Sequence, residues 1–168
     1  HTETQADREQ EAKVYYDEFG KEIIKAQNSM QDDIDKNAID TMSAGTEKQV
    51  AQINANKAKE LAALDNTITD LAQKKMDVDK KAWLKVHPKA GAADYAATAQ
   101  GKQTLDDYKK AIRSTQIVDS NGNATTVGGM EQTLAASINA KYDKQLRDAT
   151  AKADDAMDDY LAKYGSFA

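Results

Sequence analysis

The sequence of 168 residues contains no cysteine, one proline and only two histidines. The absence of cysteine excludes a disulfide framework, a thiol nucleophile and every cysteine-ligated zinc site. His87 is the single histidine away from the N-terminus, so a His-rich metal site and an HExxH motif are also excluded. No P-loop, GxGxxG or GxSxG motif occurs. We therefore assign no catalytic residue, no metal site and no cofactor, and we expect the protein not to be an enzyme.

Large apolar residues are also scarce. Val, Ile, Leu and Phe together number 25, whereas alanine alone numbers 29. No run of 18 apolar residues is present, so we expect no transmembrane segment. The net charge of −5 is small for this length, and the apolar residues are periodic, which together argue against disorder. A thin, alanine-rich core suits long helices that approach one another closely. The composition therefore predicts an elongated all-α fold.

Three long segments carry apolar residues at helical spacing and predict helices over about 5–43, 47–86 and 130–164. Gly45 is a natural C-terminal cap for the first helix, and Thr46 opens a capping box for the second. The second helix should end before Pro88, because the residue before a proline disfavours the α conformation. The short connection at Gly45 makes the first two helices antiparallel. We predict a single domain, residues 1–168, built as an up-down-up three-helix bundle.

Residues 87–128 differ in character and form an insert between the second and third long helices. Short helical patches are expected around 94–100 and 104–113. Asn121-Gly122 lies between two β-branched runs, which predicts a β-hairpin near 115–127. The bundle then places the whole insert at one tip, near the N-terminus. Oxygen-bearing residues at alternate positions from Asp119 also resemble a calcium loop, although its glycine and its twelfth residue are wrong for one.

Lysines gather at the C-terminal end of the second helix, in a protein that is otherwise acidic. One interpretation is a patch of lysines favoured by the helix dipole. The other is a partner-binding site at the tip, formed by these lysines and nearby aromatic residues. Its candidate residues are Trp83, Tyr95, Tyr108, Lys80, Lys81 and Lys85. The negative net charge argues against a nucleic-acid partner.

Paired carboxylates between Asp154 and Asp159 allow two interpretations. The i,i+4 spacing of these acids fits a solvated helix face, and it also fits a site for a hard cation or a basic partner. The residues themselves leave these alternatives open.

The elongated shape and the lack of catalytic or cofactor motifs together predict a non-enzymatic binding or structural module. It would engage another protein or a cell-surface component through the tip, as surface, adhesion, secretion or conjugation accessory proteins do. The alternative is a periplasmic holdase-like chaperone or an amphipathic lipid-binding helical protein. Heptad spacing from Leu61 to Leu71 also allows a coiled coil or a homo-oligomer.

The composition further suggests export in a bacterium, to the periplasm, the cell surface or the medium, and the alternative is a cytosolic or phage structural protein. The chain contains no cysteine and is rich in polar residues and alanine. It begins with His1 rather than Met, which fits a processed start and a trimmed one equally, and no signal peptide is visible in the sequence.

Overall fold

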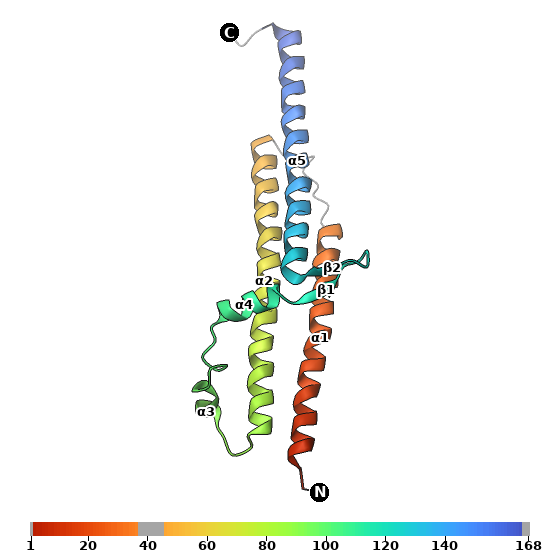
Figure 1. Ribbon diagram of the computed structural model, residues 1–168. Coiled ribbons are helices and arrows are strands. Elements are labelled where there is room, and N and C mark those ends of the chain that lie inside the picture. Colours follow the sequence, from red (N-terminus) through yellow and green to blue (C-terminus); the bar gives the residue numbers. More distant parts are fainter. Residues whose placement is uncertain (1, 37–45, 166–168) are drawn as a thin grey trace.

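The computed structural model describes residues 2–36 and 46–165, with side chains described for 2–31 and 47–165. This part of the chain is predominantly helical and contains one small antiparallel sheet of two strands. Figure 1 shows the elements in chain order. They are α1 (Gln5–Lys36), α2 (Thr46–Val86), α3 (Ala92–Ala96), α4 (Leu105–Arg113), β1 (Gln116–Val118), β2 (Ala124–Thr126) and α5 (Val127–Tyr164).

The apolar periodicity located the long helices closely. The second predicted helix, 47–86, differs by one residue from α2, and the third, 130–164, differs from α5 only in its first turn. The first prediction agrees with α1 from residue 5 onward, while its last stretch, 37–43, lies outside the described residues. The cap at Gly45 and the capping box at Thr46 lie outside the described residues and side chains as well.

The insert contains the predicted hairpin. β1 and β2 pair antiparallel, with Ile117 opposite Thr125. Gly122 takes a φ of +80° in the turn, a backbone conformation that favours glycine. At the other end, the Thr126 hydroxyl oxygen accepts a 2.9 Å hydrogen bond from the Gly129 amide and caps α5. The hairpin therefore leads directly into the last long helix.

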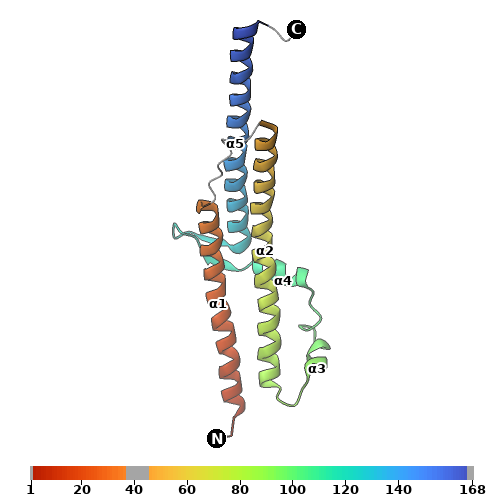
Figure 2. The ribbon, with the colours of Figure 1, turned by 180° about the vertical axis from the view of Figure 1, so that it is seen from behind.

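The position of the insert differs from the prediction. Only α3 lies near the tip where α2 ends, and the chain then returns along α2, so that α4 and the hairpin lie at about half its length (Figures 1 and 2). Asp65 of α2 joins the returning chain at this level: it accepts hydrogen bonds from Lys109 at 3.0 Å and from Arg113 at 2.8 Å. As a result α5 starts beside the middle of α2 and extends beyond the beginning of α2 (Figure 1).

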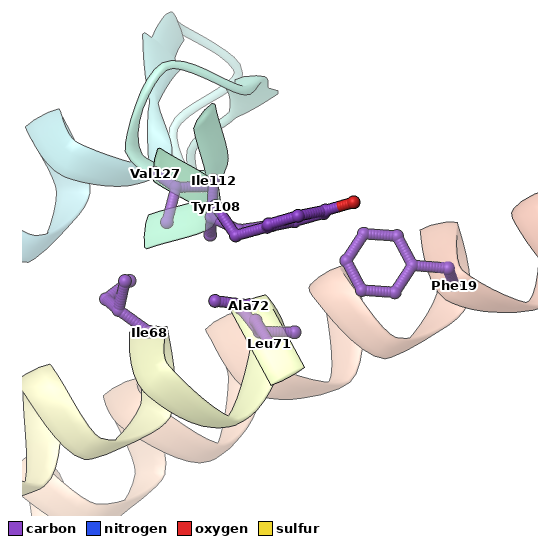
Figure 3. Packing of buried hydrophobic residues seen from close by; sticks show 7 residues of the cluster. All are labelled: Phe19, Ile68, Leu71, Ala72, Tyr108, Ile112 and Val127. Atoms are coloured by element: carbon purple, nitrogen blue, oxygen red, sulfur yellow. The ribbon is translucent and has the colours of Figure 1, made fainter. Parts of the chain in front are cut away.

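Two buried clusters follow from this stagger. One joins α1, α2, the insert and the start of α5, and Figure 3 shows its residues facing one another: Phe19, Ile68, Leu71, Ala72, Tyr108, Ile112 and Val127. The other joins α1, α2 and α5 and comprises Met30, Ile53, Leu64, Leu134, Ile138, Tyr142 and Ala149. The insert thus replaces α5 as the third packing partner along the second half of α2.

Candidate binding surfaces of the insert

The structure brings two of the predicted site residues together at the end of α2. The Trp83 ring stacks on His87 with 4.0 Å between ring centroids and lies 5.6 Å from Tyr95 in a tilted arrangement. We call Trp83, His87 and Tyr95 the tip cluster. Trp83 is half-buried and His87 is exposed, whereas Tyr95 is buried. The tip cluster therefore presents a partly covered aromatic surface, with Tyr95 beneath it.

The predicted lysines have different surroundings. Lys85 forms ion pairs with Glu3, just before α1, at 3.0 Å, and with Glu11, within α1. These two carboxylates raise the pKa of Lys85 above its ordinary value. Lys81 pairs at 2.9 Å with Asp77, one turn earlier on the same helix. Lys85 thus fastens α1 to α2, and two of the three predicted lysines have acidic neighbours that offset their charge.

Tyr108 belongs to a buried polar group. Its hydroxyl donates a 2.6 Å hydrogen bond to Oδ2 of Asp79, and Lys75 donates one of 2.9 Å to Oδ1 of the same carboxylate. Burial, and then the hydrogen bond to Asp79, raise the pKa of Tyr108. The Lys75 ammonium also lies 4.3 Å from the centre of the Tyr16 ring. In this structure Tyr108 therefore holds the insert against α2 and has no exposed ring to offer a partner.

Asp79 was not among the residues singled out from the sequence. Its position could have indicated that it is buried, because it lies seven residues after Ala72 on the face of α2 that is otherwise apolar. A small cavity of about 280 Å³ lies beside this group, between α2 and the insert, and is lined in part by Asp77, Lys80 and Tyr95. Lys80, the third predicted lysine beside Lys81 and Lys85, is exposed at the rim of this cavity.

A larger hollow, which we call the hairpin groove, lies between α1, the hairpin and the first turns of α5. Its volume is about 950 Å³. Its α1 wall consists of Gly20, Ile23, Ile24, Gln27, Asn28 and Gln31; its hairpin wall of residues 115–121 and Thr125; and its α5 wall of Met130, Thr133, Leu134 and Ser137. Sequence reasoning missed this groove, because it depends on where the hairpin lies relative to α1.

The hairpin groove carries exposed apolar groups. Ile24 on α1 is 59% exposed and Val118 on β1 is 64% exposed. Apart from Tyr164, they are the most exposed large hydrophobic side chains in the described part of the chain. Burial of both side chains against a partner would remove apolar surface from water. Such burial stabilises a complex by roughly 25 cal/mol per Å² of apolar surface.

The groove is also almost without charge. Asp119 is the one ionisable residue among the described residues that line it. Its Oδ1 accepts hydrogen bonds from the amides of Asn121, at 2.9 Å, and Asn123, at 2.8 Å, and so shapes the hairpin turn. This confirms the hairpin interpretation of the Asp119–Thr125 stretch. Among the described residues, no group of three or more His, Cys, Asp or Glu is arranged to hold a metal ion.

The chain was compared with protein-family models, with curated proteins and with solved structures, and no match was found in any of the three comparisons. None of the described helices combines the length and the apolar character needed to cross a membrane.

Proposed function

We propose that this protein is a non-enzymatic binding and structural module that engages a macromolecular partner through its insert. In this proposal the three long helices form an elongated up-down-up scaffold, and the hairpin groove is the contact surface. Binding segments on rigid scaffolds are commonly loops and connections, and the insert is such a connection. The proposal keeps the predicted role of the insert and moves the contact from the tip to the hairpin.

One observation carries the proposal: Ile24 and Val118 are strongly exposed apolar side chains, and both line the same groove. They come from elements far apart in the sequence, so their meeting is a product of the fold. The groove volume of about 950 Å³ is within the range of about 300–1,000 Å³ that is usual for ligand-binding clefts.

Panning of phage-displayed random short peptides on the purified protein tests this proposal. Enriched peptides should bind the unmodified protein and should lose at least tenfold in affinity for the Ile24→Asp and Val118→Asp variants. Val14→Asp is the matched control, because Val14 is a 43% exposed apolar residue of α1 that does not line the groove. The absence of enriched peptides, or binding that is equally strong in all three variants, would contradict the proposal.

The tip cluster is a second candidate contact, favoured by the exposed face of the Trp83–His87 stack. Aromatic residues that are half-covered in the free protein are common anchors at interfaces. A partner held there would lose affinity on Trp83→Ala or Lys81→Glu, and the groove variants would leave its affinity unchanged. The same selected peptides, tested against these two variants, distinguish the two surfaces.

The holdase or lipid-carrier alternative would need the long helices to separate. Ile53, Ile68 and Ile138 are completely buried between them, so separation would expose the two core clusters together. Suppression of the aggregation of an unfolded client protein, without denaturant, would support this alternative. Export from the cytoplasm and the absence of enzymatic activity stay predictions from the sequence.

A further inference from the structure

We infer that the hairpin groove takes an extended, uncharged peptide segment of a partner protein, which adds as a strand to the outer edge of β1. This inference rests on the proposed function, since it names the chemistry of the partner and the way in which it is held. Addition of a strand to a sheet edge is a recurring mode of peptide recognition, in which backbone hydrogen bonds supply affinity and side-chain pockets supply specificity.

The hydrogen-bond pattern of the hairpin shows which groups of β1 point outward. The Asp119 amide donates to the Asn123 carbonyl at 2.9 Å, and the Val127 amide donates to the Thr115 carbonyl at 3.0 Å. Hydrogen-bonded pairs alternate with non-hydrogen-bonded pairs along an antiparallel ladder. Ile117 and Thr125 are therefore the bonded pair between these two, and the N–H and C=O groups of Gln116 and Val118 point away from β2.

These outward groups are available for pairing. Within the described residues, neither the Gln116 backbone nor the Val118 backbone makes a hydrogen bond away from the hairpin. An unpaired strand edge is a ready template for another strand. Natural edges are often blocked by lysine, proline or a covering segment, and β1 contains neither lysine nor proline.

The groove runs along this same edge. Seven consecutive residues from Thr115 to Asn121 line it, whereas Thr125 is the one residue of β2 that does so. Successive side chains of a strand point to opposite faces. From this lining, which contains consecutive residues of β1 but only Thr125 of β2, we infer that the hollow lies beside the outer edge of β1. The space for an added strand and the backbone groups that would bind it thus coincide.

The walls of the groove specify an uncharged strand with at least one apolar side chain. Ile24 and Val118 offer apolar contacts, and the remaining polar groups are the amides and hydroxyls of residues such as Gln27, Asn28 and Thr133. The Asp119 carboxylate already accepts two backbone hydrogen bonds in its own turn. Away from Asp119, a charged side chain buried in this groove would lose its hydration without gaining an ionic partner.

Two other occupants fit the groove less well. A helix satisfies its own backbone, so it would cover the outward groups of Gln116 and Val118 without pairing them, and an unpaired buried polar group is destabilising. A second copy of this chain that paired β1 with β1 would bring its own α1 along, because α1 forms the wall opposite the hairpin in each copy. That helix would occupy the space that the added strand needs.

Proline substitutions on the two strands test the inference with the peptides selected above. Val118→Pro removes the outward N–H of residue 118 in β1, and Ala124→Pro removes the outward N–H at the directly opposite position of β2. Neither change removes a hydrogen bond between the two strands. We expect Val118→Pro to weaken peptide binding at least tenfold and Ala124→Pro to leave it unchanged. Val118→Ala separates the loss of the side chain from the loss of the N–H.

Amide hydrogen exchange on the unmodified protein gives a second measurement that requires no substitution. Bound peptide should slow exchange at Gln116 or Val118 strongly, and should change exchange at Ile117 little, because that amide already pairs with β2. The inference is overturned if both proline variants bind alike, or if exchange at β1 is unchanged while Ile24→Asp still abolishes binding. In those cases the groove binds peptide in another way and the proposed function stands. If no peptide is enriched at all, the proposed function fails together with the inference.

Discussion

The hydroxyl of Tyr108 lies 2.6 Å from Oδ2 of Asp79, and both side chains are buried. This hydrogen bond joins α4 to α2 across 29 positions of sequence. Together with the pairing of Arg113 with Asp65 at 2.8 Å, it keeps the returning insert in place along α2. These polar contacts and the apolar contacts of Ile112 and Val127 with α2 together position the hairpin and its groove.

Tyr108→Phe should destabilise the fold by about 1–3 kcal/mol, because the buried Asp79 carboxylate loses a hydrogen-bond donor. The free energy of unfolding in urea measures this loss. Tyr164→Phe is the matched control, since Tyr164 is 60% exposed and its substitution should change stability by less than about 0.5 kcal/mol. Equal stability of the two variants would show that the Tyr108–Asp79 hydrogen bond contributes nothing to the fold.

Stability should fall as the pH rises above 10. Burial raises the pKa of Tyr108 and of Tyr142 above the ordinary value of 10.0, so the folded protein holds these protons more tightly than the unfolded chain does. Their contribution is complete below pH 10 and is lost as the pH rises further. Above pH 10, each such tyrosine should steepen the fall of the unfolding free energy with pH by about 1.4 kcal/mol per pH unit. Unfolding titrations between pH 9 and 11 should therefore show a shallower slope for Tyr108→Phe than for the unmodified protein.

Lys85→Met should lower the thermal midpoint more than Lys81→Met does. Lys85 joins α1 to α2 through Glu3 and Glu11, whereas Lys81 pairs within its own helix. The Lys85 ammonium holds the pKa of Glu3 below its ordinary 4.5, so this contribution is present at neutral pH and is lost as the pH falls below that value. The difference between the two variants should shrink in high salt and in acid. A difference that persists once Glu3 is protonated in acid would show that the effect arises from packing.

Gly101→Ala should destabilise the α3 region by about 1–3 kcal/mol, because a Cβ there would collide with the backbone carbonyl of Tyr95. Gly91→Ala is the control: its Cβ would lie 3.9 Å from Oδ2 of Asp94, an ordinary contact. Fluorescence of Trp83, the only tryptophan, reports on this region, since its ring lies 5.6 Å from Tyr95. We expect a changed emission spectrum for Gly101→Ala and none for Gly91→Ala.

Ile68→Ala should cost about 2–5 kcal/mol, since Ile68 is fully buried where α2 meets the insert. Ile24→Ala, at a 59% exposed position, should cost little in stability. Denaturant unfolding of both variants checks this contrast. If Ile24→Ala were as damaging as Ile68→Ala, Ile24 would belong to the core, and its role in the hairpin groove would have to be abandoned.

The sequence predicted the elements far better than their arrangement. Helical periodicity and the Asn121-Gly122 turn are local signals, and they placed α2, the hairpin and most of α5 within a few residues. The return of the insert along α2 depends on pairs such as Tyr108 with Asp79 and Arg113 with Asp65, which are separated by 29 and 48 positions. Nothing in the local pattern of these residues identifies their partners.

The same limit explains the outcome for the candidate site. Aromatic and basic residues at the end of α2 were visible in the sequence, but their partners were not. Only the fold shows that Tyr108 binds Asp79 and that Lys85 binds Glu3 and Glu11. The hairpin groove places Ile24 and Val118 along one surface. In the sequence, neither residue alone indicates a binding site.

Because α5 is staggered relative to α2, its last turns lie far from the hairpin groove. α5 passes the groove at Ser137 and continues as one helix to Tyr164, beyond the start of α2 (Figures 1 and 2). At 1.5 Å per residue this stretch measures about 40 Å. α5 therefore fixes the distance and direction between the groove and its own last turns. An inserted helical turn would lengthen that distance by about 5.4 Å.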